Sequence, residues 1–313
     1  MSRKSFLAES SMNSITAEIF DIERFAIKDG PGIRTVVFMQ GCPLSCPWCS
    51  NPESRPFGKV LEHKESKCLH CGACAAACPQ SAVSVKDGAV CIDRPSCTFC
   101  GACVENCPGG ALRISPKQMD VEDVVGIVLR DKDYYDHSGG GVTFSGGEAL
   151  MQPEALLAML KLCKKNGLHT AIETSMNAPY EVVRQIEPHT DLFLIDLKHT
   201  DGGKLREVTG ANSGLILENI RNLARMDSKK IRLRLPCIPG FNVDGEHFRK
   251  AFTFAKDNGI TGLDLLPYHT LGAGKYRQLG LDYEFGQDGP LDRKVLEPYA
   301  KEGISMGLDI KIL

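Results

Sequence analysis

Residues 33–53 read IRTVVFMQGCPLSCPWCSNPE, an apolar and β-branched run that leads directly into three closely spaced cysteines. The run predicts a buried strand, and Cys42, Cys46 and Cys49 predict a metal-binding loop at its end. Three thiolates can hold three corners of a 4Fe-4S cube, so the fourth iron must take a ligand from outside the protein. We therefore predict a cluster with one open iron, where chemistry takes place. The alternative is a zinc site, which usually takes four protein ligands in paired C-x2-C knuckles.

Two copies of the pattern C-x2-C-x2-C-x3-C-P follow, at residues 68–79 and 97–108. In such runs the fourth cysteine binds the cluster of the other run. The predicted ligand sets are Cys68, Cys71, Cys74 and Cys107 for one 4Fe-4S cluster and Cys97, Cys100, Cys103 and Cys78 for the other. Because no iron is left open, these clusters are predicted to accept and pass single electrons. There are two alternatives. The cysteines bind zinc that only stabilises the fold, or they bind intact clusters that have a purely structural role.

The composition predicts a soluble, cytoplasmic protein. Hydrophobic residues make up 42% and charged residues 24% of the 313 residues, which is ordinary for a globular chain. A net charge of -2 gives no electrostatic reason to bind nucleic acid or an anionic membrane. The first residues lack the apolar stretch of a secretory signal, and no run of 18 apolar residues occurs, so no membrane span is predicted. Cysteines in C-x2-C spacing then indicate metal in a reducing compartment.

Strand-like and helix-like segments alternate through the rest of the chain, which predicts an α/β fold with parallel strands joined by helices. Strands are predicted at 33–38, 141–144, 168–172, 192–195, 231–235 and 263–266. Helices are predicted at 121–129, 153–165, 180–186, 215–224 and 245–257. Such a sheet is either doubly wound or a barrel. Chemically active residues follow successive strands, as at 146–148, 173–174, 196–198 and 269, and this distribution favours a barrel-like mouth.

The uneven spread of cysteines predicts the domain boundaries. Twelve of the fourteen cysteines lie between residues 42 and 107, and the stretch around the two repeats reads as short strands and turns held together by metal. We predict that residues 60–117 form a small insert with two 4Fe-4S clusters. Residues 1–59, with the first cysteine loop, and residues 118–313 are predicted to form the two parts of one larger domain.

Four segments accompany the first cysteine triplet. They are residues 28–35 (KDGPGIRT), 141–148 (GVTFSGGE), 196–198 (DLK) and 265–269 (LLPYH). In this order the five motifs resemble the radical S-adenosylmethionine (SAM) superfamily and, within it, the activating enzymes of glycyl radical enzymes. The resemblance covers nearly the whole chain. It implies a partial (β/α)6 radical SAM barrel with an inserted bacterial ferredoxin-like α+β domain.

The resemblance also implies a SAM site. The amino and carboxylate groups of SAM would chelate the open iron on Cys42, Cys46 and Cys49, which makes these cysteines catalytic as well as metal ligands. Gly146 and Gly147 would let the backbone approach the methionine amino group, Glu148 would orient that turn, and Trp48 would pack against the adenine. The alternatives are a plain turn for the glycines and a core aromatic for Trp48.

Further SAM contacts are implied at Asp196, Lys198, Arg234 and His269. The first two lie two residues apart at a strand end, so they converge on one ligand. The alternative for Arg234 is a surface ion pair. Glu173 and Thr174, with Asp196, match positions that would hold a monovalent cation, although the chain reads ETSM at 173–176 where the family often reads DTNG or DTSG.

The implied activity is the reductive cleavage of SAM to methionine and a 5'-deoxyadenosyl radical, which removes hydrogen from one glycine of a partner glycyl radical enzyme. Asp29 is the residue expected to contact the glycine-bearing peptide, and a turn-capping role is its alternative. Flavodoxin or ferredoxin is the expected electron donor. Family partners include decarboxylases, dehydratases, choline trimethylamine-lyase and isethionate sulfite-lyase, and the residues do not separate them.

Two other functions stay open on the sequence. One is a radical SAM enzyme that acts on a small molecule or a peptide. The other is an electron-transfer ferredoxin fused to a binding domain, which would not cleave SAM.

Overall fold

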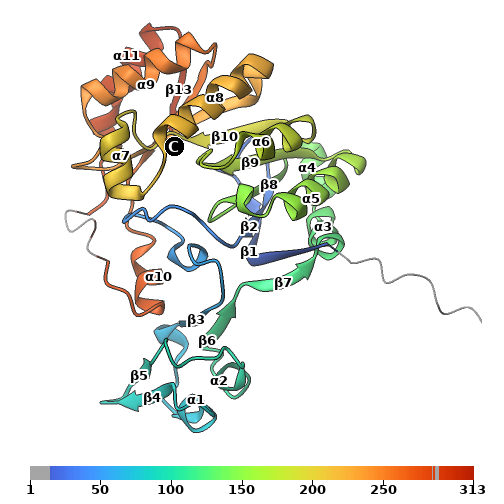
Figure 1. Ribbon diagram of the computed structural model, residues 1–313, viewed down its shortest axis with the longest axis vertical. Helices are drawn as coiled ribbons and strands as arrows, with labels where there is room; N and C mark the ends of the chain where they lie inside the picture. The colour runs from blue at the N-terminus through green and yellow to red at the C-terminus, as the bar shows by residue number, and fades with distance from the viewer. Residues whose placement is uncertain (1–14, 284, 286–288) are drawn as a thin grey trace, which may run out of the picture.

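Six parallel strands form the centre of the fold. They are β2 (Arg34–Met39), β8 (Gly141–Gly146), β9 (His169–Thr174), β10 (Leu192–Asp196), β11 (Ile231–Cys237) and β12 (Gly262–Pro267). The computed structural model, which describes residues 15–283, 285 and 289–313, places these strands side by side in chain order (Figure 1). Because the order never reverses, the sheet has no switch point of the doubly wound kind. The predicted partial (β/α)6 barrel is confirmed, and each predicted strand is present within a few residues of its predicted bounds.

Three further strands extend the sheet at its two edges. β1 (Thr16–Ala26) pairs antiparallel with β2, and β7 (Lys117–Asp120) pairs antiparallel with β1. At the other edge β13 (Asp309–Ile312) runs parallel to β12. None of these was predicted, since each lies outside the regular strand–helix alternation.

Helices connect the parallel strands. Those predicted are present as α3 (Val121–Leu129), α5 (Pro153–Lys165), α6 (Tyr180–Ile186), α8 (Ser213–Asp227) and α9 (Gly245–Asp257). Those not predicted are α4 (Lys132–Ser138), α7 (Gly202–Thr209), α10 (Ala273–Gln278) and α11 (Glu297–Ser305). Short 3-10 helices are η1 (Pro52–Ser54), η2 (Glu65–Lys67), η3 (Ala149–Met151), η4 (Glu187–His189), η5 (Ser228–Lys230) and η6 (Arg293–Leu296). Neighbouring helices pack on one another, as α3 does on α5 and α5 on α6.

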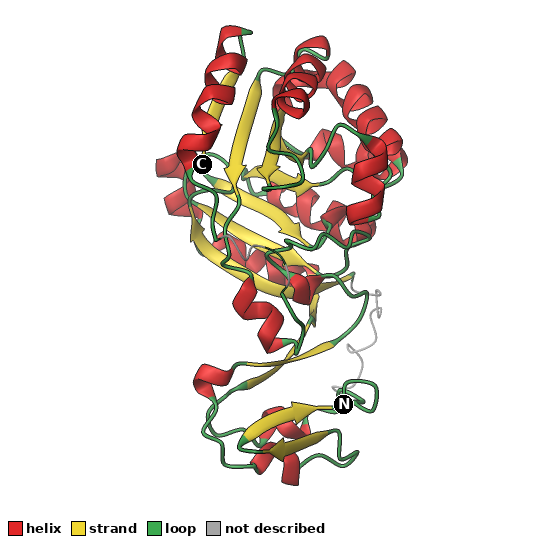
Figure 2. Cartoon of the chain, turned by 90° about the vertical axis from the view of Figure 1, so that its left-hand side faces the viewer, coloured by secondary structure: helices red, strands yellow, loops and turns green. Residues whose placement is uncertain are grey.

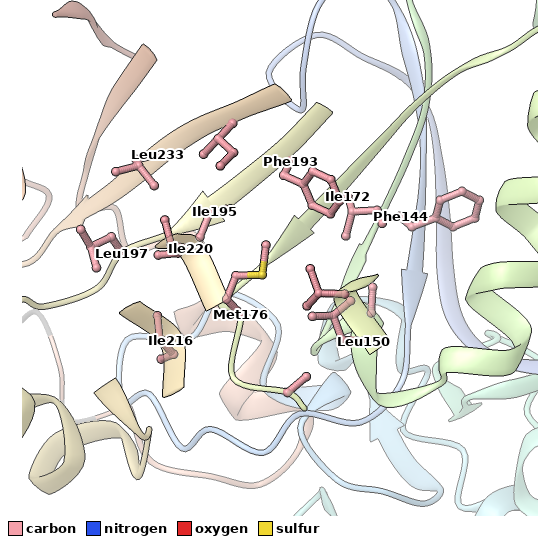
Figure 3. Packing of buried hydrophobic residues seen from close by; sticks show 14 of the residues in the cluster. Phe144, Leu150, Ile172, Met176, Phe193, Ile195, Leu197, Ile216, Ile220 and Leu233 are labelled. Atoms are coloured by element: carbon pink, nitrogen blue, oxygen red, sulfur yellow. The ribbon is translucent and has the colours of Figure 1, made fainter. Parts of the chain in front are cut away.

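The main core lies between the strands and the helices that cover them. Phe144, Ile172 and Phe193, from three neighbouring strands, have no exposed surface. Ile216 and Ile220 on α8 are four residues apart, on one helix face, and belong to the same buried cluster (Figure 3). Burying a side chain of this size stabilises a fold by about 1.5–3 kcal/mol. The strands are therefore held rigidly, and their carboxyl ends form a fixed frame.

A small second unit lies below the barrel and is joined to it through β3 (Val60–His63) and β6 (Leu112–Ser115), which pair antiparallel (Figures 1 and 2). It also holds a hairpin, β4 (Val83–Lys86) and β5 (Ala89–Ile92), and two single-turn helices, α1 (Ala73–Ala76) and α2 (Ala102–Glu105). Its own core is small and comprises Leu61, Cys74, Val83, Cys103 and Leu112.

The two halves of this unit repeat each other in backbone conformation. His70 and Phe99, one residue before the second cysteine of each run, have φ angles of 50° and 54°. Gly72 and Gly101, one residue after that cysteine, have φ angles of 73° and 89°. These values lie in the left-handed region, which non-glycine residues rarely adopt. The repeat seen in the sequence is therefore a repeat of structure.

Over the described residues, no helix combines the length and the apolar character needed to cross a membrane.

Candidate active site

A cavity of about 360 Å³, open to solvent, lies where the six parallel strands end. Each strand contributes wall residues from its carboxyl end or from the turn that follows, as expected for a barrel mouth. The predicted residues that line it are Asp29, Cys42, Cys46, Trp48, Cys49, Gly146, Gly147, Glu173, Thr174, Asp196, Lys198 and His269. Two predicted residues, Glu148 and Arg234, do not line the cavity and are buried behind its wall.

The cysteine loop presents three sulfur atoms to this cavity. The backbone N–H of Leu44 donates to Cys42 Sγ (3.5 Å), and that of Asn51 donates to Cys49 Sγ (3.4 Å). Burial raises the pKa of Cys42 to about 12 and that of Cys46 to about 11, so the free thiols are neutral near pH 7. Because metal coordination requires the thiolate, binding of iron would supply the positive charge that stabilises these buried sulfurs. The loop thus fits a cluster with three protein ligands.

Helix α10 fixes the cysteine loop from the outside. The Tyr276 hydroxyl donates to the carbonyl oxygen of Pro47 (3.1 Å). Lys275 Nζ donates to Asn51 Oδ1 (2.6 Å) and to Glu53 Oε1 (2.7 Å). No sequence pattern indicates this role, because α10 has only six residues and no clear apolar period.

Gly146 and Gly147 bring the turn after β8 against the strand that leads into the cysteine loop. Gly146 has a φ of 124°, and a Cβ atom there would lie 2.2 Å from the Met39 carbonyl oxygen. A Cβ atom on Gly147 would lie 2.5 Å from the Gly41 carbonyl oxygen. The Gly147 N–H donates to Met39 O (2.9 Å), and the Glu148 N–H donates to Gly41 O (2.8 Å). These glycines thus allow two segments of the protein backbone to pack closely against each other. This role is additional to the close approach to a ligand that the family resemblance implies.

Glu148 joins two of the turns that form the cavity wall. Its carboxylate accepts hydrogen bonds from the Ser175 hydroxyl (2.6 Å), the Ser175 N–H (2.8 Å), the Thr174 hydroxyl (2.6 Å) and the Leu150 N–H (3.3 Å). Burial raises its pKa, and these donors oppose that rise. The predicted orienting role therefore extends to the turn after β9. Ser175 was not predicted as part of the site.

Asp196 and Lys198 lie side by side in the cavity, as their spacing at a strand end predicts. Lys198 Nζ donates to Asp196 Oδ2 (2.6 Å). Burial alone would lower the pKa of Lys198, but Asp196 and Cys46 raise it above its usual value. Asp196 Oδ1 is buried without a hydrogen-bond partner among the described residues. The pair therefore offers one free acceptor and a charged ammonium group to a polar ligand.

Glu173 is already engaged by the protein. It accepts from the Ser145 hydroxyl (2.5 Å) and from Arg234 Nη1 (2.5 Å). Arg234 is 4% exposed, so the surface ion pair considered for it is wrong and the pair is a buried one. Thr174 donates its hydroxyl hydrogen to Glu148, which leaves only lone pairs for a cation.

Asp29 points its carboxylate toward the same cavity. Burial and the nearby Glu173 raise its pKa to about 6, and Arg234 and Arg34 oppose the rise. Trp48 is both a cavity wall and a core aromatic, since it is 8% exposed and packs 4.8 Å from the Phe241 ring centre.

The two repeats of the small unit surround two separate cavities. Cys68, Cys71, Cys74 and Cys107 line one, and Cys78, Cys97, Cys100 and Cys103 line the other. The structure thus groups the eight cysteines in the crossed pattern that the spacing predicts. Burial opposes ionisation of Cys78 and Cys107, but the backbone N–H groups of the following turns lower the pKa of both thiols.

Comparison with known proteins agrees with this geometry. The Radical SAM superfamily model matches residues 88–254, and the 4Fe-4S dicluster domain model matches residues 60–108. The choline trimethylamine-lyase activating enzyme of Oleidesulfovibrio alaskensis is 40% identical over 280 residues, covering 85% of this chain and 88% of that protein. The 4-hydroxyphenylacetate decarboxylase activating enzyme of Clostridioides difficile is 40% identical over 299 residues, covering 92% and 93%.

Among solved structures, Streptococcus suis SuiB bound to precursor peptide SuiA superposes with a TM-score of 0.56. The match covers 89% of this chain and 48% of SuiB at 13% identity. It therefore concerns the fold alone.

Proposed function

The chain belongs to the radical SAM superfamily and, within it, to the activating enzymes of glycyl radical enzymes, and from this premise we propose a mechanism for its cavity. The protein cleaves SAM reductively to methionine and a 5'-deoxyadenosyl radical, which removes a hydrogen atom from one glycine of a partner enzyme. The observation that carries the proposal is the convergence of three cysteines, one buried and two partly buried, with the ends of all six parallel strands on one cavity.

Cys42, Cys46 and Cys49 would hold a 4Fe-4S cluster and leave one iron without a protein ligand, where SAM would bind. When bound, this cluster supplies the electron that breaks the C5'–S bond of SAM. Lys198 and the free oxygen of Asp196 bind the polar groups of SAM, and His269 borders the same space. Trp48, already fixed by Phe241, packs against the adenine.

Residues behind the wall hold this arrangement in place. Gly146 and Gly147 bring the turn after β8 close to the cysteine loop, and Glu148 ties that turn to the one after β9. A monovalent cation, if one binds, takes oxygen ligands from Asp196 and Thr174, since both Glu173 oxygens already accept hydrogen bonds.

The small unit, residues 60–117, carries two further 4Fe-4S clusters, which makes three in the chain. Four cysteines line each of its cavities, so both clusters have a full set of protein ligands. When bound, these clusters would supply a path for single electrons from flavodoxin or ferredoxin to the barrel. The match to a 4Fe-4S dicluster domain supports iron over the zinc alternative.

The partner is a glycyl radical enzyme of the kinds that the relatives' names mention, a choline trimethylamine-lyase or a 4-hydroxyphenylacetate decarboxylase among them. Glycine is a suitable target for hydrogen abstraction, because it has no side chain to block the approach of the radical and its flanking amides delocalise the unpaired electron. Asp29, on the cavity wall, accepts a backbone N–H of the glycine-bearing segment.

Reconstitution with iron and sulfide, followed by addition of SAM and dithionite, tests the proposal. The protein is expected to form 5'-deoxyadenosine, and a variant with Cys42, Cys46 and Cys49 all changed to Ala is expected to form none. A glycine-centred electron paramagnetic resonance doublet should appear only when a glycyl radical enzyme is added. Absence of 5'-deoxyadenosine from the wild type overturns the radical SAM chemistry. SAM cleavage with no doublet across a panel of glycyl radical enzymes favours a small-molecule or peptide substrate instead.

A further inference from the structure

Three side chains hold the carbonyl groups of Lys28, Asp29 and Pro31, in the loop that carries Asp29. Arg234 Nη2 donates to the Lys28 carbonyl oxygen (2.5 Å), and the Thr143 hydroxyl donates to that of Asp29 (2.6 Å). Arg34 Nη1 donates to the Pro31 carbonyl oxygen (3.1 Å). The donors come from β11, β8 and β2, so the loop backbone is tied to three strands of the barrel.

The two arginines in this set are buried, at 0% exposure for Arg34 and 4% for Arg234. A buried guanidinium is costly unless its donors are satisfied, so these contacts fix the loop and the arginines together. Arg34 Nε also donates to the Thr143 hydroxyl oxygen (2.7 Å), which links two of the three anchors.

The Asp29 side chain, in contrast to its backbone, is free. Its carboxylate makes no hydrogen bond or ion pair to any residue in the described part of the chain, although it borders the cavity. A fixed backbone with a free carboxylate is preorganised to accept a ligand N–H, because little entropy is lost on binding.

Arg234 makes a second contact that no other anchor makes. Its Nη1 donates to Glu173 Oε1 (2.5 Å), and Glu173 lines the same cavity. One guanidinium therefore spans from the carboxyl end of β9 to the loop before β2. The planar guanidinium directs two separate nitrogens, Nη1 and Nη2, at these two acceptors from one rigid group, whereas a lysine ammonium would have to serve both from a single nitrogen.

We propose that Arg234 is a positioning residue that sets Asp29 for the partner's glycine-bearing segment by bridging Glu173 and the Lys28 carbonyl group. The proposal rests on the proposed function, in which Asp29 contacts that segment. The family resemblance had implied a SAM contact for Arg234, and its place behind the cavity wall gives it a different task.

Limited trypsin digestion of the holoprotein tests the anchor directly, because trypsin cuts the peptide bond whose carbonyl group Arg234 holds. Arg234→Gln is expected to speed cleavage after Lys28 about tenfold, as loss of a charged hydrogen bond raises the population of open loop. Arg184→Gln is the control. Arg184 lies on α6 and pairs with Glu181 on the exposed surface, away from the cavity, so cleavage after Lys28 should keep the wild-type rate. Equal rates in the wild type and Arg234→Gln overturn the proposal.

Two further variants distinguish the loss of a loop anchor from a general loss of folding. Thr143→Val removes the anchor on the Asp29 carbonyl group and leaves the Arg234–Glu173 pair intact, so it should also speed cleavage after Lys28. Arg234→Lys keeps the charge, and if it restores the wild-type rate, charge alone suffices and the bridging role is wrong.

The kinetic readout is the KM for whichever glycyl radical enzyme gives the radical signal. Arg234→Gln and Thr143→Val should raise this KM at least about fivefold and leave kcat within about twofold, since the loop acts on binding of the partner. An unchanged KM in both variants contradicts the proposal. If the wild type forms no 5'-deoxyadenosine, the proposed function fails, whereas the digestion result on the loop still stands.

Discussion

At the scale of single residues, Glu148 organises the cavity without bordering it. Four hydrogen-bond donors from three residues converge on its buried carboxylate, and those residues follow two different strands. Removing a buried charge that satisfies several donors leaves those donors without partners, which costs several kcal/mol. Glu148 therefore acts on the cavity indirectly, because it holds in place two of the turns that form the cavity wall.

Replacement of Glu148 by Ala should destabilise the protein by about 3–5 kcal/mol, which corresponds to a fall in the thermal midpoint of about 10 °C. Circular dichroism melting of the protein under anaerobic conditions measures it. Glu154→Ala, on the exposed face of α5, is the control and should change the midpoint by less than about 2 °C. A Glu148→Ala midpoint equal to that of the control contradicts the structural role.

Asp29 should impose a pH dependence on partner binding. Its pKa is raised to about 6 by burial and Glu173, so the carboxylate is mostly protonated below that pH and ionised above it. If the ionised form accepts the partner's backbone N–H, the KM for the partner falls as the pH rises through about 6. Asp29→Asn should have a higher KM that lacks this step. Glu23→Gln, which removes a carboxylate that helps to raise the Asp29 pKa, should keep the step and move it to lower pH. A step of the same size in Asp29→Asn means that another group titrates.

At the scale of elements, the turn after β8 and the cysteine loop form one packed unit. Gly146 lies opposite Met39 in the pairing of β8 with β2, and its missing Cβ leaves room for the Met39 carbonyl group. Any side chain there would separate the two strand ends, and a φ of 124° is also unfavourable for other residues. Correct placement of the three cysteines thus depends on a glycine in another strand.

Gly146→Ala should therefore lose the cluster on the cysteine loop and keep the two clusters of the small unit. Iron analysis should give about eight iron atoms per chain in place of about twelve. Gly126→Ala provides the matched control, because Gly126 lies in α3 with open space around the position of a Cβ atom. That variant should bind full iron and be equally or slightly more stable. Full iron content in Gly146→Ala contradicts this reading of the turn.

The elements also show what the sequence could and could not predict. Apolar runs such as 192–195 and periodic segments such as 245–257 predicted strands and helices correctly, because burial on one or both faces leaves a clear pattern. β13 has four residues and α10 six, too few for a pattern to emerge. The role of Lys275 depends on contacts more than 200 residues away along the chain, and no local signal carries such contacts.

At the scale of the whole molecule, the antiparallel pair of β3 and β6 connects the small unit to the barrel (Figure 2). The small unit holds eight cysteines in two groups. Each group takes three cysteines from one repeat and one from the other. This exchange ties the two repeats together through metal in a unit whose hydrophobic core is small.

Changes at Cys68 and at Cys107 should remove the same cluster, so the double variant Cys68→Ala/Cys107→Ala should lose no more iron than either single change. Cys78→Ala should remove the other cluster, as Mössbauer and electron paramagnetic resonance spectra can establish. With flavodoxin as donor, each of these variants should form the glycyl radical more slowly than the wild type. If activation by flavodoxin is unaffected in a folded variant, the electron-relay role of the small unit is wrong.

The transfer of one hydrogen atom from the partner's glycine to the SAM-derived 5'-deoxyadenosyl radical, which becomes 5'-deoxyadenosine, is the central claim, and isotope labelling measures it directly. A partner glycyl radical enzyme is prepared with glycine deuterated at the α-carbon, and is incubated with the reconstituted protein, SAM and a reductant. One deuterium atom is expected in the 5'-deoxyadenosine formed, together with the glycyl radical doublet. Formation of 5'-deoxyadenosine without deuterium, while the doublet appears, would contradict direct abstraction from glycine by this protein.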